Sequence, residues 1–338
     1  MPEPVFPELR EVERIDVRAL TPGTRHSFAL RVTPLADGSV LRVPVLVAAG
    51  HVAVGPTAGP CLALVAGVHG DEAEGMAALV DLWRDLDPAT LSGSVILVTV
   101  ANPPAFGANQ RRSPIDGVDL NRVFPGNAEG SPSERLAHAL FRLVADNAQF
   151  LFTLHSWYAT GDAIPHVEFQ ATPSPVRDAS LKAALGAGFV HIKAADWHPG
   201  LFPRAAVAAG IPAMESELGG AGIYTAAHLA AHRRHITALM RHMGILPGAA
   251  PPAAGAQVYD TASVIAPRGG MLRSSVTLGE RVAKGQAMAT IGDLHGAPRE
   301  TLCAPEEGIV ATVRNFLSVS AGDLVFRILC RPRPPSFG

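Results

Sequence analysis

The sequence is poor in cysteine and has no dominant charge, and both shortages exclude classes of protein. Its three cysteines, Cys61, Cys303 and Cys330, are widely scattered, so they predict neither a disulfide framework nor a cysteine-type zinc site. Such usage is typical of a reducing compartment. The formal net charge of -2, with no long block of like charge, offers no basic surface to nucleic acid or to an anionic membrane. We therefore expect small-molecule chemistry in the cytoplasm.

Signals for export and membrane insertion are also lacking. Residues 1–16 have neither the basic start nor the apolar run of a secretory signal. Residues 43–68 contain no Asp, Glu, Lys or Arg and are long enough to cross a bilayer. Prolines and glycines divide this stretch into two short apolar runs, which is typical of strands buried in an α/β sheet. We predict no membrane span.

Apolar runs alternate with helix-like stretches through most of the chain, and this alternation predicts an α/β fold. We expect a three-layer sandwich with a mostly parallel or mixed sheet. The expected strands are 41–48, 61–66, 94–100, 150–154 and 211–217, and the expected helices are 71–85, 133–147, 176–185, 203–209 and 224–243.

The composition changes between residues 246 and 256, which are rich in Pro, Gly and Ala and carry no charge. We therefore predict a main domain over 1–250 and a β domain over 251–332. Two similar glycine-flanked turns, at 275–286 and 316–325, suggest a small barrel or sandwich built from two related halves, similar to biotinyl and lipoyl carrier domains. A carrier needs a lysine at the hairpin between the halves, and none occurs there.

The motif GVHGDEAEG directly follows the apolar run at 61–66 and contains a metal-ligand spacing. His69 and Glu72 lie three residues apart at the end of a strand. If a helix begins near Asp71, the imidazole precedes its first turn and the carboxylate lies inside it, so both can converge on one ion. Two His and one Glu are typical of catalytic zinc with an open fourth position, so hydrolysis is the first hypothesis.

Further polar motifs follow other predicted strands, where open α/β sheets bind ligands. In order, GVHGDEAEG, ANPPAF, DLNRVFPG, TLHS and ELGG resemble the succinylglutamate desuccinylase and aspartoacylase family, relatives of the zinc carboxypeptidases, over residues 41–222. The resemblance implies one Zn²⁺ per chain, held by His69, Glu72 and His155. It also implies a C-terminal β domain.

The same resemblance makes Glu217 the catalytic carboxylate, which takes a proton from water and returns it to the leaving amine. Glu215 is an alternative, because residues two apart on a strand point to the same face and sequence geometry does not separate them. The Leu-Gly-Gly that follows favours Glu217 and leaves Glu215 as a hydrogen-bonded support.

Arginines are the expected anion contacts. The resemblance implies that Arg112 polarises the scissile carbonyl and that Asn121 and Arg122 fix the substrate's negative end. The assignment between Arg111 and Arg112 can slip by one residue. Arg204 is a further candidate for binding the substrate.

Some neighbouring residues are expected to be structural. Asp71 is a candidate for orienting a metal-bound histidine, and Asp119 for bracing the loop or an arginine. His166 lacks a motif and is expected in a loop or at the surface, within a pocket-shaping loop at 161–174.

The sequence thus predicts a zinc-dependent deacylase that cleaves the amide bond of an N-acyl amino acid or a related small carboxylate. The alternatives are a metallocarboxypeptidase acting on short peptides and a non-catalytic metal-binding module. The sequence does not determine the acyl group or the amine. It also leaves the oligomeric state open, and a homo-oligomer is one of the options.

Overall fold

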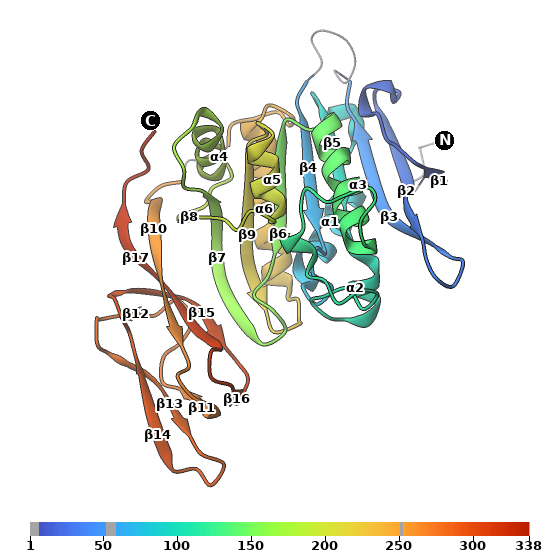
Figure 1. Ribbon diagram of the computed structural model, residues 1–338. Coiled ribbons are helices and arrows are strands. Elements are labelled where there is room, and N and C mark those ends of the chain that lie inside the picture. The colour runs from blue at the N-terminus through green and yellow to red at the C-terminus, as the bar shows by residue number, and fades with distance from the viewer. Residues whose placement is uncertain (1–6, 52–58, 251–252, 338) are drawn as a thin grey trace.

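The computed structural model describes residues 7–51, 59–250 and 253–337, and within them one long mixed sheet organises the molecule (Figure 1). Strands β4, β5, β6 and β9 run parallel to one another, whereas β7 is antiparallel to β9. Their carboxyl ends therefore meet at one edge. The order is β1 (Leu9–Val12), β2 (Thr24–Pro34), β3 (Val40–Ala49), β5 (Ser94–Val98), β4 (Cys61–Ala66), β6 (Phe150–His155), β9 (Ala213–Gly220), β7 (Gly161–Gln170), β8 (His191–Ala195), β10 (Gln257–Ile265), β17 (Leu324–Arg333), β15 (Gly308–Arg314) and β12 (Arg281–Val282).

Helices cover both faces of this sheet, each with its own apolar core. On one face α1 (Ala73–Asp85), α4 (Pro175–Gly186) and α6 (Ala226–His242) pack against the strands. On the other face lie α3 (Pro132–Asn147) and α5 (Phe202–Ala208). Every residue of β4 is buried, which accounts for its uninterrupted apolar sequence. The remaining helical segments are α2 (Pro103–Ala108), η1 (Val17–Ala19), η2 (Pro88–Thr90) and η3 (Leu120–Arg122).

The α/β class with a mixed sheet is confirmed, and the five predicted strands and five predicted helices all form close to their expected limits. The first predicted helix begins later than expected. Glu72 is its N-cap residue and makes no capping bond to it, because the carboxylate is engaged elsewhere. None of the described helices is long and apolar enough to cross a membrane.

The expected loop at 161–174 was wrong over most of its length, because β7 occupies residues 161–170 at the centre of the sheet. Its sequence contains a proline and several polar residues, so it shows neither a continuous apolar run nor a regular alternation. His166, expected in a loop or at the surface, is completely buried on this strand.

The C-terminal strands form a second group with a core of their own (Figure 1). A four-stranded sheet, counted over the described residues, faces β10, β17, β15 and β12. The group is tied to the main sheet, since β10 pairs with β8 and β15 pairs with β7. The predicted boundary after residue 250 falls at 251–252, which lie outside the described residues. The small sheet has the order β14 (Pro298–Cys303), β13 (Ala287–Gly292), β11 (Gly270–Ser274) and β16 (Ser318–Val319).

Candidate metal centre

The loop that follows β4 is held rigidly against the start of α2. Gly67 has a φ of +67°, a conformation that glycine adopts without strain. A Cβ at Gly70 would lie 2.0 Å from the carbonyl carbon of Ala105, so only glycine permits this approach of two backbones. The Gly70 amide also donates to the Gln110 carbonyl oxygen at 3.0 Å. The backbone beside His69 is therefore fixed before any ligand binds.

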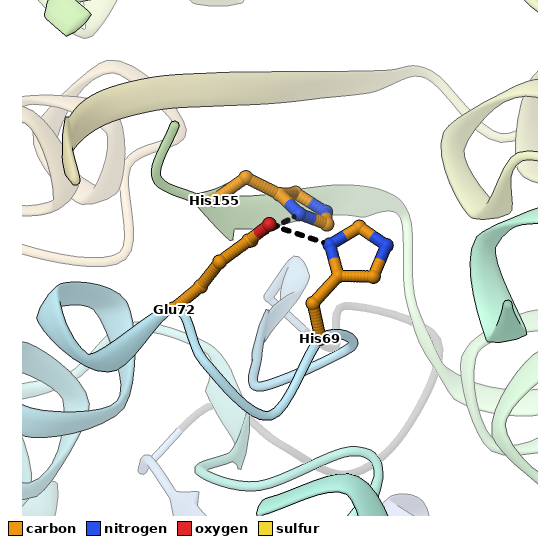
Figure 2. A group of neighbouring side chains, drawn as sticks. All are labelled: His69, Glu72 and His155. Atoms are coloured by element: carbon orange, nitrogen blue, oxygen red, sulfur yellow. Dashed lines mark hydrogen bonds and ion pairs between the residues drawn. The ribbon is translucent and has the colours of Figure 1, made fainter. Parts of the chain in front are cut away.

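The structure brings together the three residues predicted to bind a metal (Figure 2). His69 Nδ1 lies 2.6 Å from one oxygen of Glu72, and His155 Nδ1 lies 2.8 Å from the other. One ligand atom from each residue falls within 4.8 Å of the others. The three residues are only 2 to 3% exposed. They come from the β4–α1 loop, the N-cap of α1 and the last residue of β6, so the sheet edge assembles them.

The charges around this cluster favour a cation. Burial raises the pKa of Glu72, but the two histidines lower it by a larger amount. The pKa of this carboxylate is therefore well below its usual range. Burial lowers the pKa of His155, yet the negative charges of Glu215, Glu72 and Glu217 raise it to about 10. Surroundings that hold a proton on an imidazole this strongly also suit a divalent ion.

A carboxylate supports each histidine from its other ring nitrogen. His69 Nε2 lies 3.2 Å from Asp119 Oδ1, and His155 Nε2 lies 3.3 Å from Glu215 Oε2. The contact with Asp119 is a hydrogen bond of the kind that orients metal-binding imidazoles, whereas His155 Nε2 makes no hydrogen bond within the described residues and Glu215 acts on it through charge alone. Both Nδ1 atoms face Glu72, and two imidazoles with one carboxylate are a donor set that fits a divalent metal such as zinc.

Asp71, the candidate for such support, has no bond to a histidine. Its Oδ1 is buried without a partner among the described residues. Asp119 is the carboxylate that bonds His69 instead. It also caps η3, where its Oδ1 accepts from the Asn121 amide, and it accepts from Arg111 Nε at 3.0 Å. Both functions expected of Asp119, bracing the loop and an arginine, are therefore met.

Glu217 lies beside the cluster with a carboxylate that is not committed to the protein. It stands directly across from His155 in the parallel pairing of β9 with β6. Its Oε2 is buried and has no hydrogen-bond partner in the described ranges. Burial and the charges of Glu72 and Glu215 raise its pKa well above the usual value, although His155 opposes them. By contrast, Glu215 accepts from Asn121 and Thr153.

Arg111 is the arginine that reaches the cluster, and Arg112 is not. Arg111 Nη1 lies 3.5 Å from Glu72 Oε1, and its guanidinium stacks 4.7 Å from the ring of Tyr158. The side chain of Arg112 points to solvent and donates to the Gly117 carbonyl. Arg111 and Arg112 therefore lie in different environments, so a slip of one position exchanges a site residue for a surface residue.

The remaining predicted contacts occupy different positions. Asn121 is buried, and its side-chain amide donates to Glu215 and accepts from the Phe202 amide. Arg122 is exposed and donates to the Asn121 carbonyl at 2.7 Å. Arg204 is half-buried on α5 and makes no hydrogen bond or ion pair within the described residues. Asn121 thus lies behind the ligands, while Arg122 lies at the surface.

A second group of buried charges continues the site along β7 and β8, and sequence reasoning missed it. Lys193 Nζ donates to Glu168 Oε1 at 2.6 Å, and Arg327 Nη1 lies 3.8 Å from the same oxygen. Burial raises the pKa of Glu168, but Lys193 and Arg327 together lower it to about 2. Burial lowers the pKa of His166 to about 4. The only available signal was the presence of the charged residues Glu168 and Lys193, which belong to no recognised motif.

Comparison with known proteins agrees with this geometry. A family model described as the succinylglutamate desuccinylase/aspartoacylase catalytic domain matches residues 58–243. The N-alpha-acetyl-L-2,4-diaminobutyric acid deacetylase of Halomonas elongata is 33% identical over 278 residues, which are 79% of this chain and 81% of that protein.

Two solved structures are also similar over nearly their whole length. One is a succinylglutamate desuccinylase/aspartoacylase from Rhodobacter sphaeroides, with 29% identity, a TM-score of 0.80 and coverage of 90% of this chain and 95% of that one. The other is the product-bound ectoine utilization protein EutE (DoeB) from Ruegeria pomeroyi, with 26% identity, a TM-score of 0.82 and coverage of 90% and 94%. The chain belongs to the succinylglutamate desuccinylase/aspartoacylase family.

Proposed function

We propose that this protein is a zinc-dependent deacylase that hydrolyses the amide bond of an N-acyl amino acid or a related small carboxylate. The observation that carries the proposal is the convergence of His69, Glu72 and His155 beside the uncommitted carboxylate of Glu217. The similarity to a relative named as an N-acetyl-diaminobutyric acid deacetylase supports the same reaction type.

His69, Glu72 and His155 would hold the ion, which supplies polarisation of water and of the scissile carbonyl. Glu217 takes a proton from the attacking water and passes it to the leaving amine, so that the acyl carbon gains the hydroxyl group and the nitrogen gains the hydrogen. Its pKa is raised by burial and by the charges of Glu72 and Glu215, which suits a carboxylate that takes up a proton and later releases it.

The other polar residues prepare the site for this chemistry. Arg111 presents a guanidinium beside the ligands and stabilises the negative charge that develops on the carbonyl oxygen. Arg122, exposed at the rim, attracts the negative end of the substrate from solvent. Asn121 acts from behind by bonding Glu215, and Arg204 remains a candidate for a more distant anion contact.

We further infer that residues 1–250 form a catalytic domain of the three-layer, zinc-carboxypeptidase type and that 251–332 form a C-terminal β domain. Helices on both faces of the sheet and the separate C-terminal core support this division. A single zinc per chain and a cytoplasmic location are proposed with it.

The direct test is hydrolysis by the zinc-loaded protein. Release of free amine should be measured with N-acetyl and N-succinyl amino acids, Nα-acetyl-2,4-diaminobutyrate and N-acetylaspartate among them, and with blocked dipeptides of similar size. We expect turnover of at least one N-acyl amino acid, its loss on treatment with a chelator, and its recovery with zinc. Faster turnover of the dipeptides would identify a carboxypeptidase. Absence of any hydrolysis by protein shown to contain zinc would overturn the proposal.

A further inference from the structure

A strand from the C-terminal part of the chain delivers an arginine to the wall of the candidate site. Arg327 lies on β17, and its guanidinium carbon is 4.8 Å from the centre of the Trp157 ring. Trp157 is buried and follows the proposed metal ligand His155 by two residues. The C-terminal strands therefore meet the catalytic sheet at the site and not at a remote surface.

Two arginines flank the same pair of aromatic rings. Arg111 stacks on Tyr158 as Arg327 stacks on Trp157, and the centres of the two rings are 5.0 Å apart. Burial raises the pKa of the Tyr158 hydroxyl, and both guanidinium charges oppose that rise. The guanidinium groups of Arg111 and Arg327 thus both lie close to the Tyr158 hydroxyl, although Arg111 comes from the main part of the chain and Arg327 from the C-terminal strands.

The hydrogen-bonding capacity of Arg327 is largely unused. Its Nη1 is 3.8 Å from Glu168 Oε1, too far for a hydrogen bond, and that oxygen already accepts from Lys193 at 2.6 Å. Its Nε is buried and has no partner among the described residues. Its side chain as a whole is 22% exposed. A partly buried guanidinium with unmet donors matches the planar, bidentate geometry of a carboxylate.

The position of Arg327 is set by the fold, because the strands around it are packed closely onto the Trp157 loop. β15 pairs with β7 where Arg314 faces Gly161. A Cβ at Gly161 would lie 2.6 Å from both Trp157 Cδ1 and the Val313 carbonyl oxygen, so glycine alone permits this contact. A residue on such a scaffold keeps its geometry better than one on a free loop.

We propose that Arg327 binds the α-carboxylate of the N-acyl amino acid, so that the C-terminal strands supply one wall of the substrate pocket and select substrates with a free carboxylate. This inference rests on the deacylase function proposed above. Arg111 is already bonded to Asp119, which suits it to the carbonyl oxygen, whereas Arg327 has donors free for a second anionic group.

The test compares one substrate with its neutral analogue. Wild type, Arg327→Gln and Arg327→Lys should be assayed on the best N-acyl amino acid and on the same compound with its carboxylate replaced by a carboxamide. Hydrogen bonds to charged groups predict a fall in kcat/KM of about 10- to 100-fold for Arg327→Gln on the acid, mainly through KM. Activity on the carboxamide should stay near that of wild type, and Arg327→Lys should recover part of the loss.

A matched control is Arg333→Gln on the same strand, since Arg333 is 45% exposed and pairs with Asp260 at 2.8 Å. This control should leave kcat/KM unchanged on both the acid and the carboxamide. Calorimetric titration of metal-free and zinc-loaded protein with the product amino acid and with its amide provides a readout independent of turnover. Arg327→Gln should weaken binding of the acid alone, by the same factor.

Equal losses on the acid and the carboxamide would overturn the proposal, because they would mean that Arg327 only supports Trp157. An unchanged KM for the acid would also overturn it. If circular dichroism shows that Arg327→Gln does not fold, Arg327→Lys provides the same comparison with a smaller effect. If wild type hydrolyses no N-acyl amino acid, the proposed function fails, and product binding still decides the role of Arg327.

Discussion

Replacing Glu217 by glutamine should separate proton transfer from metal binding. Glutamine has nearly the same shape, and Glu217 Oε2 has no hydrogen-bond partner within the described ranges, so the fold should be little disturbed. The amide cannot accept a proton from water. General acid-base catalysis contributes about 100- to 10,000-fold, so we expect kcat to fall by that factor, which is about 3 to 5 kcal/mol of activation free energy. Zinc should remain bound.

Replacing Glu215 by glutamine should give the opposite result. Its Oε2 lies 3.3 Å from His155 Nε2, and it also accepts from Asn121 and Thr153. Loss of its charge weakens the support of a ligating imidazole, which costs about 10- to 100-fold in metal affinity, or about 1.4 to 2.7 kcal/mol. At saturating zinc, most of the turnover should return.

Zinc affinity can be measured by competition with a chelating dye, and turnover by release of free amine at saturating zinc. The exposed Glu129, whose side chain is 87% accessible, provides a matched Glu→Gln control that should change neither quantity. The assignment from hydrogen-bond partners is refuted if Glu215→Gln keeps its zinc but loses turnover while Glu217→Gln stays active. Equal effects of both variants on both measurements would show that the two carboxylates act as one unit.

Four further predictions concern the site and the fold. Arg111→Lys should lower kcat/KM about 100-fold, as loss of one oxyanion donor does, whereas Arg112→Lys should leave initial rates unchanged. Gly70→Ala places a Cβ 2.0 Å from Ala105 backbone and should weaken zinc binding about 10-fold or more in the dye assay. Burial lowers the pKa of His232 to about 3, so the unfolded chain binds the extra proton and stability falls as the pH drops from about 6.5 toward 3. His232→Leu should reduce that slope by up to about 1.4 kcal/mol per pH unit in urea titrations. Phe152→Ala removes a fully buried ring and should cost about 3 to 5 kcal/mol of unfolding free energy, and a cost below about 1 kcal/mol would contradict the packing described.

The proximity of His69 and His155 could be predicted from the sequence because each lies at the end of a strand with a strong signal or just beyond it. β4 and β6 are buried along their whole length, so their apolar runs stand out and their ends are well defined. Parallel neighbours end at one edge, so His69 and His155 had to approach each other. The open choice between Glu215 and Glu217 required coordinates, because both point to the same face and differ only in their partners.

Residues whose contacts depend on loop geometry or on distant parts of the chain could not be assigned in this way. The loop that carries Arg111 and Arg112 has no period, so sequence alone does not indicate which guanidinium turns inward. The orienting role of Asp119 depends on a contact between residues fifty positions apart. Arg327 lies more than 150 residues from Trp157, and no local pattern connects them.

β7 was missed for a reason that also explains its position. On its inner face, His166 pairs with Glu217 and Glu168 pairs with Glu215, so this strand continues the polar rows that begin at the proposed metal ligands. A strand that lines such a site must bury charge, and burial of Glu168 is tolerable because Lys193 and Arg327 compensate it. The apolar pattern that identifies ordinary core strands is therefore absent here. A polar interruption within an otherwise apolar sheet indicates where the chemistry lies, and β7 borders the C-terminal strands at that place.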